Sequence, residues 1–192
     1  TRLVGANVGE AEVQIRKFDA QNLANTSWAF ATAGVSSTRL FEAIAAEALV
    51  QIQKFNAQNL ANTSWAFATA GVSSIRLFEA IAAEVQVQIR KFNAQNLANT
   101  SWAFATAGVS STRLFEAIAA EAQVQICKFK AYELSITSWA FATAGISSTR
   151  LFEAISVEAQ AQIRKFNAQN LANTSWAVAR AGVSSTRLVE AS

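Results

Sequence analysis

Residues 59–71 read Asn59-Leu-Ala-Asn-Thr-Ser-Trp-Ala-Phe-Ala-Thr-Ala-Gly71, and the same sequence returns unchanged at 22–34 and 96–108. Its tryptophan recurs every 37 residues (102 − 65, for example), at Trp28, Trp65, Trp102, Trp139 and Trp176. A fixed period of this length is typical of stacked repeats, in which each unit is one supersecondary motif covered by its neighbours. The 192-residue chain therefore predicts about five copies of one motif, without a single central core.

One unit, residues 56–92, predicts two helices. Asn56 suits an N-cap, a helix follows over 57–70, and Gly71 suits the left-handed residue that ends it. Ser74 then caps a second helix over 75–91. The connections are short, so neighbouring helices pack antiparallel. The predicted fold is all-α, an α-solenoid of about five helix-turn-helix repeats.

The period also divides the chain. The predicted units are 19–55, 56–92, 93–129, 130–166 and 167–192, and residues 1–18 are the second helix of a preceding unit. The sequence lacks an initial methionine and starts and stops in mid-repeat, so we expect a fragment of a longer array.

A helical wheel of 57–70 separates two sides. Leu60, Trp65 and Phe67 fall on an apolar side, and Asn59 and Asn62 on the other, with the small Ala66. We interpret the tryptophan as a packing residue between helices and repeats. The alternative is a base-stacking residue, since aromatic rings often hold single-stranded nucleic acid.

Residues that carry catalysis are missing. The chain has no histidine and one cysteine, Cys127, which excludes Ser-His and Cys-His pairs, a zinc cluster and an internal disulfide. Phosphate-binding glycine loops are also missing. The sequence therefore predicts a protein that is not an enzyme and has no cofactor, no metal and no small-molecule substrate. No apolar run approaches the ~20 residues of a membrane span.

The helix motif resembles that of the heptatricopeptide and octotricopeptide repeat families. Leu60-Ala61, Trp65-Ala66 and Gly71 match the pattern, and a heptatricopeptide unit has the same length. The resemblance covers essentially the whole chain. It implies an α-solenoid that binds single-stranded RNA in mitochondria or plastids and acts in transcript stability, processing, translation or ribosome assembly.

The leading functional hypothesis is a modular RNA binder that reads about one base per unit from a concave groove. Asparagine amides would contact the bases, since they both donate and accept hydrogen bonds. The candidate RNA-binding residues are Asn22, Asn25, Asn59, Asn62, Asn96, Asn99, Glu133, Asn170 and Asn173, and the candidate phosphate contacts are Arg39, Arg76, Arg113 and Arg150. The wheel puts Arg90 and Lys91 on the solvent side of the second helix.

Two alternatives stay open. The first is a scaffold that binds a protein partner on the same concave surface, favoured by a net charge of only +3. The second is an expanded, near-degenerate array without a present function. The fourth unit departs most, because Glu133 and Ile136 replace two asparagines while Leu134 keeps the core leucine. That change reflects either drift on a solvated surface or a different recognition by this unit.

Overall fold

Local signals set the bounds of the first helix in each unit. In the computed structural model, which describes residues 14–182, the Asn56 side chain accepts a hydrogen bond from the Asn59 backbone N–H at 2.8 Å. Gly71 ends the helix in the left-handed region, with φ of 66°, where a residue with a Cβ is strained. The helix over 57–70 is therefore confirmed, together with both of its end residues.

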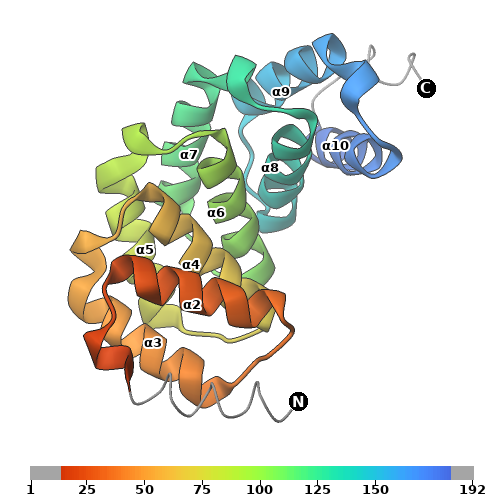
Figure 1. The fold of residues 1–192 in the computed structure, drawn as a ribbon. Helices are drawn as coiled ribbons and strands as arrows, with labels where there is room; N and C mark the ends of the chain where they lie inside the picture. The colour runs from red at the N-terminus through yellow and green to blue at the C-terminus, as the bar shows by residue number, and fades with distance from the viewer. Residues whose placement is uncertain (1–13, 183–192) are drawn as a thin grey trace.

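The described residues form nine α-helices in consecutive hairpins, separated by five 3-10 helices, and contain no strand (Figure 1). This confirms the all-α, solenoid-like fold. The first helices of the units are α2 (Ala20–Thr32), α4 (Ala57–Ala70), α6 (Ala94–Ala107), α8 (Ala131–Ala144) and α10 (Ala168–Arg180). The second helices are α3 (Thr38–Gln51), α5 (Ile75–Gln88), α7 (Thr112–Val124) and α9 (Thr149–Ala161). The 3-10 helices are η1 (Ile15–Lys17), η2 (Ile52–Lys54), η3 (Ile89–Lys91), η4 (Ile126–Lys128) and η5 (Ile163–Lys165).

The predicted terminal segments lie only partly within this range. Most of the second helix expected over 1–18, and the end of the last unit after residue 182, fall outside the described residues.

The second helix is shorter than predicted. Instead of running to Lys91, α5 stops at Gln88 and the chain continues as η3. The 3-10 turn is tighter than an α-turn, and it redirects the chain within three residues into the next first helix. Arg90 and Lys91 are exposed, as the wheel suggested, but they belong to η3 and not to the second α-helix. They lie in the connection between two units.

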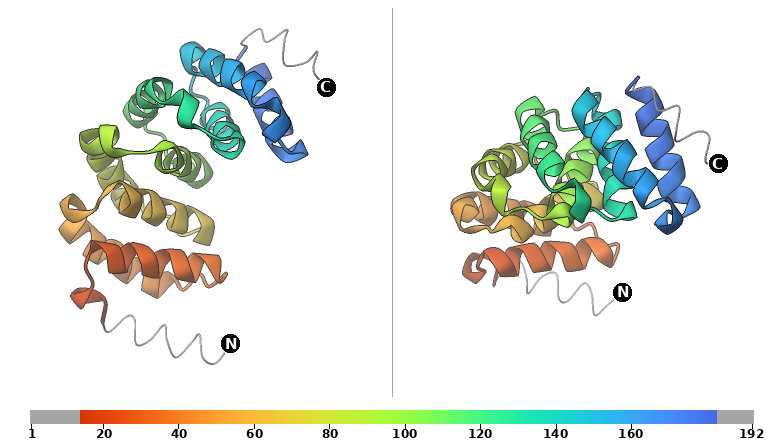
Figure 2. Two further views of the ribbon diagram at one scale, coloured as in Figure 1. Left: turned by 45° about the horizontal axis from the view of Figure 1, so that its top comes forward. Right: turned by 90° about the horizontal axis from the view of Figure 1, so that it is seen from above.

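The helices form two curved layers. First helices lie side by side along the inside of the arc, and second helices line the outside (Figures 1 and 2). The backbones of neighbouring first helices approach closely along their length, whereas neighbouring second helices touch at few points. This difference in spacing bends the array toward its first helices.

Small side chains allow the close approach of the first helices. On α4, the face toward the following unit carries Ala57, Ala61, Ser64 and Ala68, and the face toward the preceding unit carries Asn59, Thr63, Ala66 and Ala70. Leu60 and Phe67 point to the second helices and are fully buried. Three sides of the helix are thus covered.

The two end helices confirm how these faces are oriented. On α2, which has no described first helix before it, Asn22 and Ala29 of the preceding face are exposed. On α10, which has none after it, Ala168 and Ala172 of the following face are exposed instead. Each face is therefore buried only where a neighbouring first helix covers it.

Phenylalanine pairs join each second helix to the next unit. Phe78 on α5 meets Phe104 on α6 edge to face, with ring centroids 5.0 Å apart. The same geometry recurs at the preceding junction, between Phe41 and Phe67, and at the following one, between Phe115 and Phe141. Such pairs contribute roughly 0.5–1.5 kcal/mol beyond the burial of their area. In the last unit Val178 takes the place of the phenylalanine on the first helix.

A glutamine closes the open end of each hairpin. The Gln125 amide, at the end of the second helix, donates to the Phe92 carbonyl just before the first helix at 2.9 Å and to Glu121 Oε1 at 2.8 Å. The same pair of bonds recurs at Gln51, Gln88 and Gln162. These bonds satisfy a carbonyl that the helix ladder leaves open and hold the two helices of one unit together.

Ala103→Leu tests the close packing of the first helices. Ala103 is fully buried on the preceding face of α6, so the larger side chain should lower the free energy of unfolding by about 1–3 kcal/mol through overpacking. Ala83→Leu on the exposed side of α5 is the matched control and should change it by less than ~0.5 kcal/mol. Urea unfolding followed by circular dichroism measures both, and equal effects would contradict the layer assignment.

Gln125→Ala tests the closure of the hairpin. It leaves the Phe92 carbonyl without its partner, so we expect a loss of roughly 1–3 kcal/mol. The control is Gln123→Ala, because the Gln123 amide donates only within its own helix, to the Ala119 carbonyl. A Gln125 variant as stable as the Gln123 variant would show that the bond is dispensable.

Candidate nucleic-acid interface

One face of each first helix stays open to solvent on the inside of the arc. In α4 it carries Gln58, Asn62, Trp65 and Thr69, which follow helical spacing along one line. We call this line, with its equivalents in the other units, the inner stripe. Its members are Gln21, Asn25, Trp28 and Thr32; Gln58, Asn62, Trp65 and Thr69; Gln95, Asn99, Trp102 and Thr106; Tyr132, Ile136, Trp139 and Thr143; and Gln169, Asn173, Trp176 and Arg180.

The tryptophans occupy the middle of the inner stripe. Trp65 and Trp102 contact each other across two units, with ring centroids 6.2 Å apart and planes inclined by 31°. The rings are half-buried in the interior units, and Trp28 and Trp176 at the ends are 46% and 44% exposed. Trp65 and Trp102 therefore pack against each other and still offer ring surface to a ligand, which combines the two roles considered from the sequence.

The amides stand beside the rings. Gln169 Nε2 donates to Asn173 Oδ1 at 2.8 Å, which shows that the first two stripe positions of one helix meet. A glutamine and an asparagine together provide four N–H donors and two carbonyl acceptors at the surface. They can therefore bind the edge of a nucleobase next to an aromatic ring.

Part of the sequence-based site assignment is wrong. Asn59, Asn96 and Asn170 were expected in the groove but are buried, at 7%, 8% and 9% exposure, against the preceding first helix. Ala66 is likewise fully buried. The wheel assumed one covered side, whereas three sides of the helix are covered. Of the candidate asparagines, the inner stripe holds Asn25, Asn62, Asn99 and Asn173, while Asn22 is exposed only because α2 has no described first helix before it.

Glu133, the candidate of the fourth unit, also lies off the inner stripe. It has the position of Asn59, and its Oε2 accepts a hydrogen bond from the Lys130 backbone N–H at 3.0 Å. This bond satisfies an open donor at the start of α8, so the carboxylate serves the helix terminus. The inner stripe of this unit changes instead at Tyr132 and Ile136, which replace both amides.

The candidate phosphate contacts lie on the other layer. Arg39, Arg76, Arg113 and Arg150 are exposed in the first turn of second helices. Arg113 lines a cavity of about 640 Å³ that Ile75, Glu79 and Ala83 of α5 also line, and Arg76 lines a similar one beside α3. The structure therefore does not bring these arginines together with the inner stripe.

A comparison with known protein families identifies the family of this chain. Residues 3–192 match the family described as RNA-editing substrate-binding complex 6 protein, RESC6. The chain belongs to the RESC6 family. The heptatricopeptide and octotricopeptide assignment is therefore wrong. No curated protein matches the sequence.

Across residues 14–182, no three histidine, cysteine or carboxylate side chains lie close enough together to bind a metal ion. Within the same range, no helix has both the length and the apolar character needed to cross a bilayer.

Gln58 and its equivalents were missed from the sequence, although a signal was present. Gln58, Asn62, Trp65 and Thr69 are spaced by four, three and four residues, as expected for one line along a helix. Alanine, serine and threonine fill the lines on either side. A helix with small residues on both flanks is typical of close packing on two sides, and this would have identified the line between them.

Trp102→Phe tests whether the tryptophan can be altered without unfolding the array. The side chain is half-buried, so a ring of similar shape should lower stability by no more than about 1.5 kcal/mol. Thermal unfolding followed by circular dichroism measures this. Truncation of a fully buried aromatic side chain to alanine lowers the free energy of unfolding by about 3–5 kcal/mol. A comparable loss in Trp102→Phe would assign Trp102 to the core instead.

Proposed function

We propose that this chain binds single-stranded RNA along the inner stripe, as a non-catalytic component of an RNA-editing substrate-binding complex. The observation that carries the proposal is the row of tryptophans on the open side of the first helices, with Trp65 and Trp102 in contact across two units and amides beside the rings. Membership of the RESC6 family supports an RNA-related role independently, because the family is named for a complex that binds RNA-editing substrates.

Stacking supplies the affinity in this proposal. Bases stack on the exposed faces of the tryptophans, and such contacts contribute roughly 1–3 kcal/mol per base with little dependence on its identity. Arg180 lies over the Trp176 ring, 5.4 Å from its centroid, and adds a positive charge at the end of the row. The array therefore offers about one aromatic platform per unit.

The amides supply selectivity. The same Gln-Asn pair recurs in every described unit but the fourth, so we expect a preference for short, near-homopolymeric stretches. Tyr132 and Ile136 interrupt this preference, because Tyr132 offers an exposed aromatic ring in place of one amide and Ile136, which is buried, leaves the other position without a polar group. The fourth unit then accepts any base that stacks.

The absence of histidine from the whole chain supports a binding role over a catalytic one. Family membership further supports a mitochondrial location and gives no support to a plastid.

A protein scaffold is the second candidate, and one observation favours it. Val50, Val87 and Val124 occupy the same position in three second helices and are 81%, 79% and 80% exposed on the outer layer. A regular row of exposed apolar side chains is typical of a protein contact. The valines lie beside the starts of the first helices, because Val124 lines a groove together with Asn93 and Gln95 of α6.

Fluorescence anisotropy with labelled RNA homopolymers tests the leading proposal. The wild-type chain should bind at low salt, and Trp102→Leu should weaken binding about tenfold or more through the lost stack. Val157→Ala on the exposed side of α9 is the control and should bind like the wild type.

An RNA of the same length with abasic sites separates stacking from charge. It should bind the wild-type chain more weakly than intact RNA binds Trp102→Leu, because it loses the stack at every unit and the variant loses the stack at one. No binding of any homopolymer at low salt would reject the RNA proposal. Loss of assembly with its complex on changing the three valines to serine would then favour the scaffold.

A further inference from the structure

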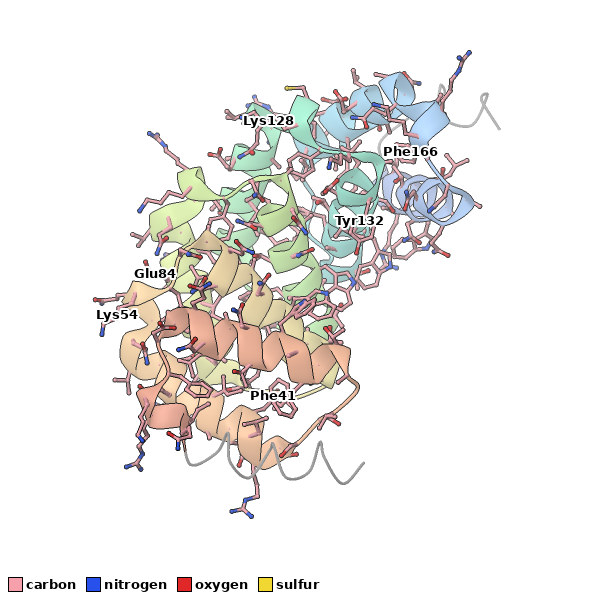
Figure 3. All side chains as sticks on the ribbon, viewed as in Figure 1. Phe41, Lys54, Glu84, Lys128, Tyr132 and Phe166 are labelled. Atoms are coloured by element: carbon pink, nitrogen blue, oxygen red, sulfur yellow. The ribbon has the colours of Figure 1, made fainter. Side chains whose placement is uncertain are left out.

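A row of cations follows one margin of the array. Each 3-10 helix carries one or two of them and leads directly into the start of the next first helix. Lys54 and Lys128 project along this margin, and Tyr132 of the inner stripe lies nearer the middle of the array (Figure 3). We call the row the basic edge; its members are Arg16, Lys17, Lys54, Arg90, Lys91, Lys128, Lys130, Arg164 and Lys165, all of them exposed.

The cations of two neighbouring units line a common groove. It has a volume of about 460 Å³ and lies between η3 with the start of α6 on one side and η4 with the start of α8 on the other. Arg90, Lys91, Lys128 and Lys130 line it. A groove bounded by cations from both sides concentrates positive potential more than isolated surface lysines do.

The acidic groups of the groove cancel only part of this charge. Two carboxylates, Glu121 and Glu133, face four cations. Each is already a hydrogen-bond acceptor: Glu121 Oε1 from the Gln125 amide at 2.8 Å, and Glu133 Oε2 from the Lys130 backbone N–H at 3.0 Å. Within residues 14–182, the four cations of the groove make no ion pair within 4.0 Å. Four cations against two carboxylates leave the groove with a formal net charge of +2 (4 − 2).

The start of α6 adds to the same field. Asn93, which caps this helix, lines the groove, and α6 continues for 14 residues beyond it. The N-terminus of a helix carries partial positive charge, and its open N–H groups favour anions. Here the helix end reinforces side chains that already carry full charges.

The groove is continuous with the inner stripe. Gln95 belongs to both, because it is the first stripe position of α6 and also lines the groove. A strand whose bases lie on Gln95, Asn99 and Trp102 thus has the basic edge immediately beside it.

We infer that the basic edge binds the phosphates of the RNA backbone while the bases lie on the inner stripe. This inference rests on the proposed function and specifies the path of the RNA strand across the array. The strand runs from unit to unit along the starts of the first helices, on the side away from Arg76 and Arg113. Because phosphate contacts release bound counter-ions, affinity must fall steeply with salt concentration.

Two triple variants with the same change in charge test the inference. Arg90→Gln, Lys91→Gln and Lys128→Gln remove three charges from the basic edge, and Arg76→Gln, Arg113→Gln and Arg150→Gln remove three from the second helices. RNA binding is measured by anisotropy between about 50 and 200 mM salt. The basic-edge variant should lower the slope of log affinity against log salt by about 2, at roughly 0.7 for each lost contact, and the control variant should leave it unchanged.

Inorganic polyphosphate separates this inference from the proposed function, because it carries phosphates without bases. It should compete with RNA for the wild-type chain and bind the basic-edge variant several-fold more weakly. RNA binding that responds equally to both triple variants would overturn the inference and leave the proposed function intact. Polyphosphate binding at the basic edge without RNA binding would reject the proposed function, and with it the assignment of RNA to this edge, and would leave only an anion site. Binding of neither ligand would reject the anion site as well. Circular dichroism should show unchanged folding for both variants, since all six side chains are exposed.

Discussion

Close contact between first helices is the constraint on which the rest of this structure depends. Alanine, serine and threonine at the facing positions allow the helix backbones to approach, while the second helices remain further apart. The difference curves the array and turns the one uncovered line of each first helix toward the inside. A functional surface therefore results from packing, because the neighbours leave each helix only that line. The phenylalanine pairs and the glutamine closures then fix the second helices against this inner layer.

The arrangement separates stability from recognition within one short helix. Leu60 and Phe67 pack against the second helices, and small residues pack against the adjacent units. The residues of the open line, which are Gln58, Asn62, Trp65 and Thr69, lie outside both of these contacts. Trp65 is the exception, since it contacts its neighbour and remains half-exposed. Substitution along the open line can therefore change binding at a small cost in stability, and the fourth unit shows such a change at Tyr132.

The fold was predictable from the sequence because its determinants are local and periodic. Asn56 and Gly71 mark the ends of a helix without reference to anything distant, and the 37-residue period implies stacking. The site was only partly predictable, since the burial of Asn59 depends on a helix from another unit. The end of the second helix was not predictable for a similar reason: Gln88 bonds to the carbonyl of Phe55, 33 residues earlier. Family membership was not predicted correctly either.

Near-identity of the facing surfaces has a further consequence for how the chain finds its native pairing. The following face of α2 fits the preceding face of α6 as well as that of α4, since both helices have the same sequence. A form that loops out one unit would thus keep equivalent contacts and lose only those of the omitted hairpin, and two molecules could pair in the same way. The departures at Ser135, Glu133 and Val178 remove part of this degeneracy. The least regular units thereby act as markers that distinguish one order of assembly from the others.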